Sequence, residues 1–250
     1  MRMFLSLLLV LLAPASALAA AKVLPHPRQL ALLADPLWLE ASILPLLAAA
    51  NRPQQLPELT NTGLAQCLSG GEFSIRPLQL QSGQRLRFEH CQRDDWHVHG
   101  VAELARDDSH SPASHFSLAL LPLIVHEGQR PALRLIWNEQ GEFAATAAGW
   151  NWQGEGAALI SSEARQPEIV EFYRLQRRLS HDGEGQIRQR LSGDITLGTA
   201  FQLQLDSHCQ LAAEAMPRCR LLRLRLSDAQ QGCWQWPDTS ADCQPLTRGE

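Results

Sequence analysis

The chain has 250 residues, a formal net charge of -4 at neutral pH, 45% hydrophobic residues and 19% charged residues. This length suits one large all-β domain or two small domains, and the mildly acidic balance gives no electrostatic reason to expect nucleic acid or an anionic membrane as partner. The chain contains no G-x-S-x-G elbow, Walker loop, H-E-x-x-H pattern or dinucleotide glycine pattern, which favours a non-catalytic protein over an enzyme.

Residues 1–21 are typical of a secretory signal peptide. A basic start is followed by a run from Phe4 to Leu12 that is apolar except for Ser6, and then by small residues, so we expect cleavage after Ala19 or Ala21. The apolar run is about half of the roughly 20 residues that a transmembrane helix needs, and no cysteine near the cleavage site could carry a lipid. We therefore expect a periplasmic or secreted protein with no integral membrane segment after cleavage.

Residues 22–63 are expected to form a helical segment and a linker. Asp35 and Pro36 are a typical helix start, with a side-chain acceptor at the cap and proline in the first turn. The apolar residues from Leu37 to Leu44 can form one stripe, which Pro45 should kink or end. A second short helical turn can follow through Ala50, and residues 52–63 are rich in Pro, Gln, Asn and Thr and are therefore expected to be a linker or loop.

Residues 64–250 are expected to form an antiparallel β domain. Apolar and polar residues alternate along this stretch, which predicts half-buried strands, and turn signals containing glycine separate the runs. Residues 161–190 fit a helical stripe or a long edge strand, and we favour the strand. Two short stretches of similar sequence leave open the alternative that the domain consists of two related β units, at about 64–160 and 185–250.

The predicted fold is therefore mainly β. We expect an antiparallel sandwich or a curved, partly open barrel, with an N-terminal helical segment that plugs or covers one face of the sheet. Arginines at alternate positions, such as Arg223 and Arg225, should cover the solvent-facing side.

Six cysteines lie in the portion expected to be exported, and none has a CxxC spacing, which favours disulfides over a zinc site. Their grouping along the chain favours the pairs Cys67–Cys91, Cys209–Cys219 and Cys233–Cys243. Cys91 is out of phase with Leu86 and Phe88, so its strand needs a local irregularity there or must place Cys91 on the solvent side.

Histidines are the only concentrated polar feature, with six of the nine between His90 and His126. A strand through Trp96–Gly100 would place His97 and His99 on one face, as half of a copper, nickel or zinc site. His115 or an aspartate of the adjoining turn could supply a third ligand. The alternative is that these histidines are solvated residues on the outer face, and no other cofactor is expected.

Trp150 and Trp152 share one strand face, and Trp234 and Trp236 share another. Core packing explains such pairs most simply, whereas exposed pairs would form an apolar platform for a ligand. We expect an exported envelope protein that binds a protein partner or an apolar ligand without catalysis. The alternative is a metal-binding protein or metal-dependent hydrolase centred on the histidine strand.

Overall fold

The computed structural model describes residues 25–50, 67, 69–107, 114–147, 149–166, 168–211, 216–229, 232–237 and 242–246. The predicted signal peptide and linker lie outside these residues. Twelve strands form one sheet in chain order, and each pairs antiparallel with the next except β11 and β12, which are parallel. The strands are β1 (Gly70–Pro77), β2 (Gly83–Arg93), β3 (Trp96–Asp107), β4 (Ser114–Glu127), β5 (Leu133–Thr146), β6 (Gly149–Ser162), β7 (Ile169–His181), β8 (Gln186–Leu197), β9 (Thr199–Gln210), β10 (Arg218–Asp228), β11 (Gly232–Trp236) and β12 (Gln244–Pro245).

The alternation in the sequence becomes a buried inner face and a polar outer face. In β9, for example, Phe201, Leu203 and Leu205 are buried, whereas Gln202 and Gln204 are exposed. This arrangement confirms the mainly β fold predicted from the alternation. The ambiguous stretch 161–190 contains strand β7, as favoured above.

Two helices, α1 (Pro27–Ala34) and α2 (Pro36–Ala50), precede the sheet. Asp35 caps α2, because its Oδ1 accepts a hydrogen bond from the Leu37 backbone N–H at 2.9 Å. No single helix in the described residues is long and apolar enough to cross a membrane; the pair α1 and α2, bent by 41°, passes that test together by length and composition alone.

Helix α2 does not end at Pro45, so the alternative in which proline ends the helix is wrong. All the residues from Leu37 to Ala48 are buried, on every side of the helix rather than along one stripe. Burying one large apolar side chain contributes about 1.5–3 kcal/mol, and an interior proline costs about 3 kcal/mol. Burial of this one helix therefore outweighs the cost of Pro45.

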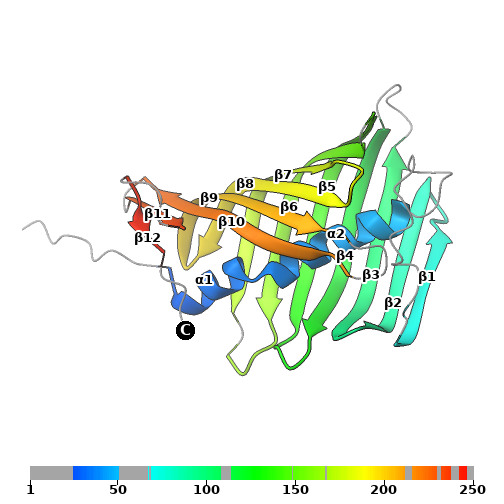
Figure 1. Ribbon diagram of the computed structural model, residues 1–250, viewed down its shortest axis with the longest axis horizontal. Helices are drawn as coiled ribbons and strands as arrows, with labels where there is room; N and C mark the ends of the chain where they lie inside the picture. Colours follow the sequence, from blue (N-terminus) through cyan, green and yellow to red (C-terminus); the bar gives the residue numbers. More distant parts are fainter. Residues whose placement is uncertain are drawn as a thin grey trace, which may run out of the picture.

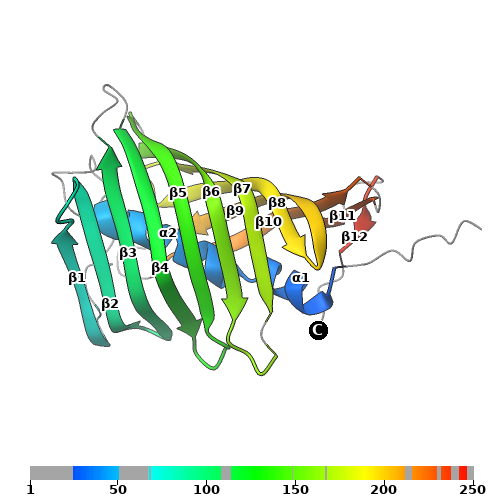
Figure 2. The same cartoon turned by 180° about the vertical axis from the view of Figure 1, so that it is seen from behind.

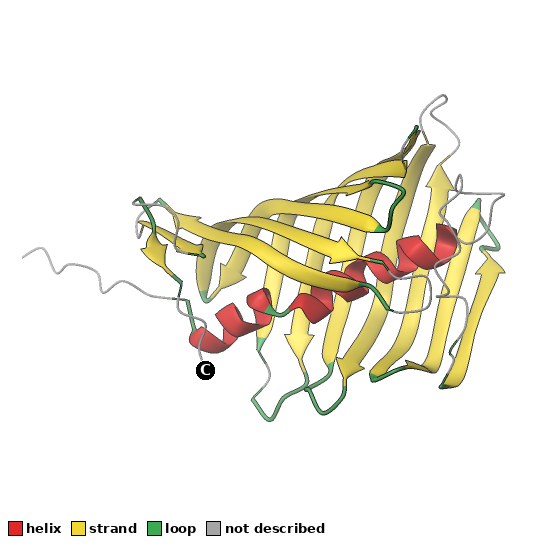
Figure 3. Ribbon diagram, in the orientation of Figure 1, coloured by secondary structure: helices red, strands yellow, loops and turns green. Residues whose placement is uncertain are grey.

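The sheet curls around α2, which fills its concave side (Figure 1). The helix contacts β2, β3, β4 and β5 on one side and β10 on the other. Figure 2 shows the wall of β1–β6 from behind, and Figure 3 shows the helical pair threading through the curled sheet. The architecture is a curved, partly open barrel with a central helix, so the interior is packed by the chain itself.

Ion pairs link β10 to the β3–β4 side of the sheet, between which the described residues show no strand pairing. Arg218, at the start of β10, forms ion pairs with Glu127 at the end of β4 and, at 3.4 Å, with Asp95 in the β2–β3 turn. Its guanidinium also lies over the Trp96 ring, 5.6 Å from the centroid. These contacts join β10 to the β3–β4 side across α2.

The three predicted disulfides are confirmed, namely Cys67–Cys91, Cys209–Cys219 and Cys233–Cys243. The expected irregularity before Cys91 is present as a register shift between Phe88 and Cys91, with His90 at a φ of 50°. This shift turns Cys91 inward toward Cys67. Three disulfides are compatible with an oxidising, extracellular compartment.

Candidate functional site

The predicted histidine strand is β3, and it places His97 and His99 on the outer face, opposite the buried Trp96 and Val98. The two imidazoles do not pair with each other. His97 stacks on His126 of β4, with ring centroids 4.4 Å apart, and His99 stacks on His90 of β2 at 4.6 Å. These stacking partners could not be predicted from the sequence, because both depend on the register between strands.

His115 lies at the opposite end of β4 from His126. The sequence separation of eleven residues corresponds to roughly 35 Å along a strand, and His115 instead lies 3.7 Å from Glu142. Within the described ranges, no group of three His, Cys, Asp or Glu residues could hold a metal ion. His97, His99 and His115 are therefore not brought together, and the metal hypothesis has no third ligand in this part of the chain.

The tryptophans predicted as an apolar platform lie mostly in the core. Trp150, Trp152 and Trp234 are buried, and Trp236 is half-buried. Trp150 stacks between Phe143 and His181, and Trp234 packs edge-on against Phe201. Their arrangement is the core packing left open above, and the three buried rings form no exposed platform.

A buried ion pair holds α2 to the sheet. Arg177 and Glu139 have side-chain exposures of 0% and 1%, and their Nη2 and Oε2 atoms are 2.7 Å apart. The indole N–H groups of Trp137 and Trp152 donate to the Glu139 carboxylate at 2.7 and 2.6 Å. Arg177 also donates to the backbone carbonyl of Ser42 in α2 at 2.9 Å. The cluster is buried, and it links β5 and β7 to the central helix.

Glycine makes room for this cluster. A Cβ atom at Gly154 would lie 1.9 Å from Oε1 of Glu139, so no larger residue fits without displacing the carboxylate. The sequence carries one signal of this buried ion pair. Glu139 and Arg177 occupy inward positions of β5 and β7, where the alternation calls for apolar residues.

A second buried acid, Glu40 of α2, faces β10. Its Oε1 accepts the backbone N–H of Cys219 at 2.6 Å. Burial raises the pKa of Glu40 to about 8 from an ordinary value of 4.5, and the hydrogen bond from Cys219 and the charge of Arg218 only partly oppose this shift. The helix–β10 contact thus contains a carboxyl that is protonated at neutral pH.

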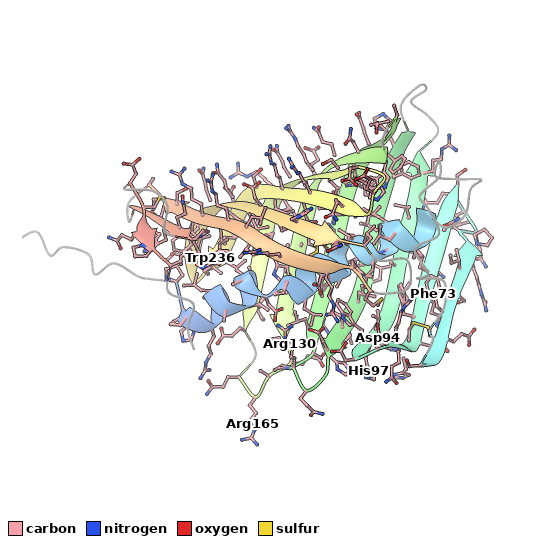
Figure 4. The ribbon with its side chains drawn as sticks, viewed as in Figure 1. Phe73, Asp94, His97, Arg130, Arg165 and Trp236 are labelled. Carbon is pink, nitrogen blue, oxygen red and sulfur yellow. A yellow bond between two sulfur atoms is a disulfide. The ribbon has the colours of Figure 1, made fainter. Side chains whose placement is uncertain are left out.

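An apolar cleft of about 550 Å³ lies beside α1. Its walls are α1 and the turns after β4 and β6, and it contains Ala31, Leu32, Pro131, Leu133 and Ala164. Most charges around it are paired within the protein, as in Asp35–Arg130 at 2.6 Å and Arg28–Glu168 at 3.9 Å. Figure 4 shows Arg165 projecting beyond this end of the molecule. Because most charged residues at its edge are already paired, the cleft offers little attraction to a charged ligand.

Exposed arginines gather on the outer side of β7–β10, which we call the arginine face. Side chains ending in nitrogen project there, away from α2, along the top of Figure 4. We define the arginine face by its six exposed arginines: Arg178, Arg188, Arg190, Arg220, Arg223 and Arg225.

Strand register brings these arginines together. One cross-strand row runs from Arg178 through Arg190 and Asp206 to Arg223, and the next row contains Ser180, Arg188, His208 and Arg220. Asp206 is the only acid in the two rows, and it pairs with Arg190 at 3.2 Å. Across the described residues, Arg178, Arg188, Arg220 and Arg223 have no ion-pair partner.

Arginines on the outer face of β2 differ in this respect. Arg85 lies 2.5 Å from Glu103, and Arg87 lies 2.6 Å from Glu89. The solvent exposure predicted for Arg223 and Arg225 is confirmed, whereas their neighbourhood could not be predicted without the register. The chain shows no significant match to protein-family models, to curated proteins or to solved structures.

Proposed function

We propose that this protein is an exported, non-catalytic binding protein that docks through its arginine face on an anionic lipid surface of the cell envelope. The observation that carries the proposal is the gathering of six exposed arginines on adjacent strands of a chain whose net charge is -4. Guanidinium groups suit phosphate oxygens, because their planar fork donates two parallel hydrogen bonds.

A lipid surface is favoured over an acidic protein by an apolar residue within the arginine face. Leu222 is 47% exposed between Arg220 and Arg223, and contact with lipid would cover it. Each arginine near an anionic membrane contributes about 1 kcal/mol, so six arginines support a dissociation constant on the order of tens of micromolar. Such docking is reversible.

The test is vesicle co-sedimentation of the purified, disulfide-bonded protein. We expect binding to vesicles that contain phosphatidylglycerol, no binding to pure phosphatidylcholine vesicles, and loss of binding in high salt. An Arg188→Gln, Arg220→Gln double variant should bind about 30-fold more weakly, from about 1 kcal/mol for each arginine.

The matched control is the Arg85→Gln, Arg87→Gln double variant, which makes the same charge change on β2, where both arginines are already paired. It should bind nearly as well as the unchanged protein. Equal weakening by the two double variants, or equal binding to neutral and anionic vesicles, would refute docking through the arginine face.

Export rests on residues 1–21, which have the pattern of a signal peptide, and the disulfides are compatible with it. Intact-mass analysis of the protein recovered outside the cytoplasm should show a chain that begins at Ala20 or Lys22. A chain that retains Met1 would contradict this part of the proposal.

A further inference from the structure

We infer that a hollow within the arginine face is a binding site for a phosphate group, which rests on the proposed function and narrows it to one ligand chemistry. The hollow has a volume of about 390 Å³ and lies over β6, β7 and β8. Its outward side chains come from Asn151, Gln153, Arg178, Ser180, Arg188 and Arg190. Buried Trp152 and Leu179 complete its lining.

The hollow exists because a short side chain stands among long ones. Ser180 is the direct cross-strand partner of Asn151 on β6 and of Arg188 on β8. Arg178 precedes it by two residues on the same face of β7. Neighbours at such positions are about 5–7 Å apart, so the arginine side chains on two sides are long enough to reach a ligand held above the serine. Arg178, Arg188 and the Ser180 hydroxyl can therefore donate hydrogen bonds to the same ligand.

Two of the three positive charges of the hollow have no acidic partner in the described residues. Its only ionisable side chains are the three arginines, and Arg178 stands directly opposite Arg190. Like charges in directly opposed positions destabilise a sheet. Asp206 pairs with Arg190 from the far side, at 3.2 Å, but no acid in the described residues pairs with Arg178 or Arg188. A bound anion would compensate the charges of these two arginines.

Phosphate matches the hollow because it has several oxygens that can each accept a charge-assisted hydrogen bond. Two guanidinium forks, a hydroxyl and two side-chain amides can be satisfied by one such group. The phosphate could belong to a lipid headgroup or be free in solution, and the two sources present the same oxygens. The experiment below separates them.

The first measurement is calorimetric titration of the purified, disulfide-bonded protein with inorganic phosphate. We expect saturable binding that weakens at least about tenfold in Arg188→Gln, because a charge-assisted hydrogen bond is lost. Ser180→Asp should abolish binding by placing a carboxylate in the hollow. The matched control Arg223→Gln changes the same charge on the same face outside the hollow, and it should change affinity less than about twofold.

The second measurement repeats vesicle co-sedimentation with phosphatidylglycerol in the presence of phosphate or of chloride at equal ionic strength. Release by phosphate but not by chloride assigns the hollow to the lipid headgroup. Phosphate binding without vesicle binding supports the site, makes free phosphate its ligand and refutes the lipid-docking function. The phosphate site is overturned if the protein binds vesicles but not phosphate, or if Arg188→Gln and Arg223→Gln are equally weakened. Either result leaves the docking function standing.

Discussion

Loss of Arg177 should destabilise the protein more than loss of any neighbouring arginine. In Arg177→Met, the Glu139 carboxylate would keep its two indole donors but lose its cation in a site with almost no solvent contact. The Ser42 carbonyl of α2 would lose its guanidinium donor as well. Removing one partner of a buried ion pair costs about 3–5 kcal/mol. For a domain of this size, that loss lowers the melting temperature by about 6–20 °C.

Two variants make this prediction specific. Arg178→Met, at the next residue, removes an exposed arginine from the opposite face of β7 and should change stability by less than about 0.5 kcal/mol. The double variant Glu139→Gln, Arg177→Met should be more stable than Arg177→Met alone. Glutamine removes the uncompensated charge, and its oxygen can still accept a hydrogen bond from an indole N–H.

The assay is urea unfolding of the disulfide-bonded protein, followed by tryptophan fluorescence. Trp137 and Trp152 contact the ion pair directly and should report its loss. The reasoning would be refuted if Arg177→Met lost less than about 1 kcal/mol, the median range of exposed pairs. An Arg178→Met variant as unstable as Arg177→Met would contradict it equally.

Three further predictions concern stability. The pKa of Glu40 is about 8 in the folded protein against an ordinary value of 4.5, so between these pH values the folded protein binds one more proton than the unfolded chain. The free energy of unfolding should therefore fall by about 1.4 kcal/mol per pH unit as pH rises from 4.5 to 8, and level off above pH 8. Glu40→Gln should flatten that dependence in urea unfolding at pH 5 to 9; an unchanged slope would exclude Glu40 as its source. Replacing both Cys209 and Cys219 by alanine should cost about 3 kcal/mol, and a melting temperature equal to that of the unchanged protein would argue against it. Gly154→Ala should cost about 1–3 kcal/mol, because its methyl group would collide with Glu139; unchanged urea unfolding would show that the carboxylate moves freely.

Local patterns predicted most of the fold. The side of a regular strand on which a residue lies depends on its position in the alternation, so buried and exposed positions could be assigned along β9 without the structure. In β10 a register shift between Leu221 and Arg223 breaks the alternation, so Leu222 is exposed although its spacing from Leu224 and Leu226 predicted the same face. Cys209–Cys219 and Cys233–Cys243 each span only 10 residues, which made both pairings predictable. The bulge before Cys91 was one of two alternatives that the break in the same alternation predicted.

Features that depend on distant contacts were not predictable in this way. Pro45 read alone is a helix breaker, and only the sheet that encloses α2 provides the burial that outweighs its cost. Glu139 and Arg177 are 38 residues apart, so their pairing depends on strands β5 to β7 standing in register. His97 likewise stacks on His126 of the neighbouring strand rather than pairing with His99.

The arginine face most clearly separates what the sequence predicts from what depends on the tertiary structure. The sequence by itself determined the net charge and the outward direction of Arg223 and Arg225, because composition is a sum and direction is set by the local backbone. It indicated no anionic partner, since a net charge of -4 averages over the whole surface. Only the tertiary structure decided that Arg178, Arg188 and Arg190 would meet around Ser180. Electrostatic interactions depend on the distance between charges, and the register of three strands sets those distances.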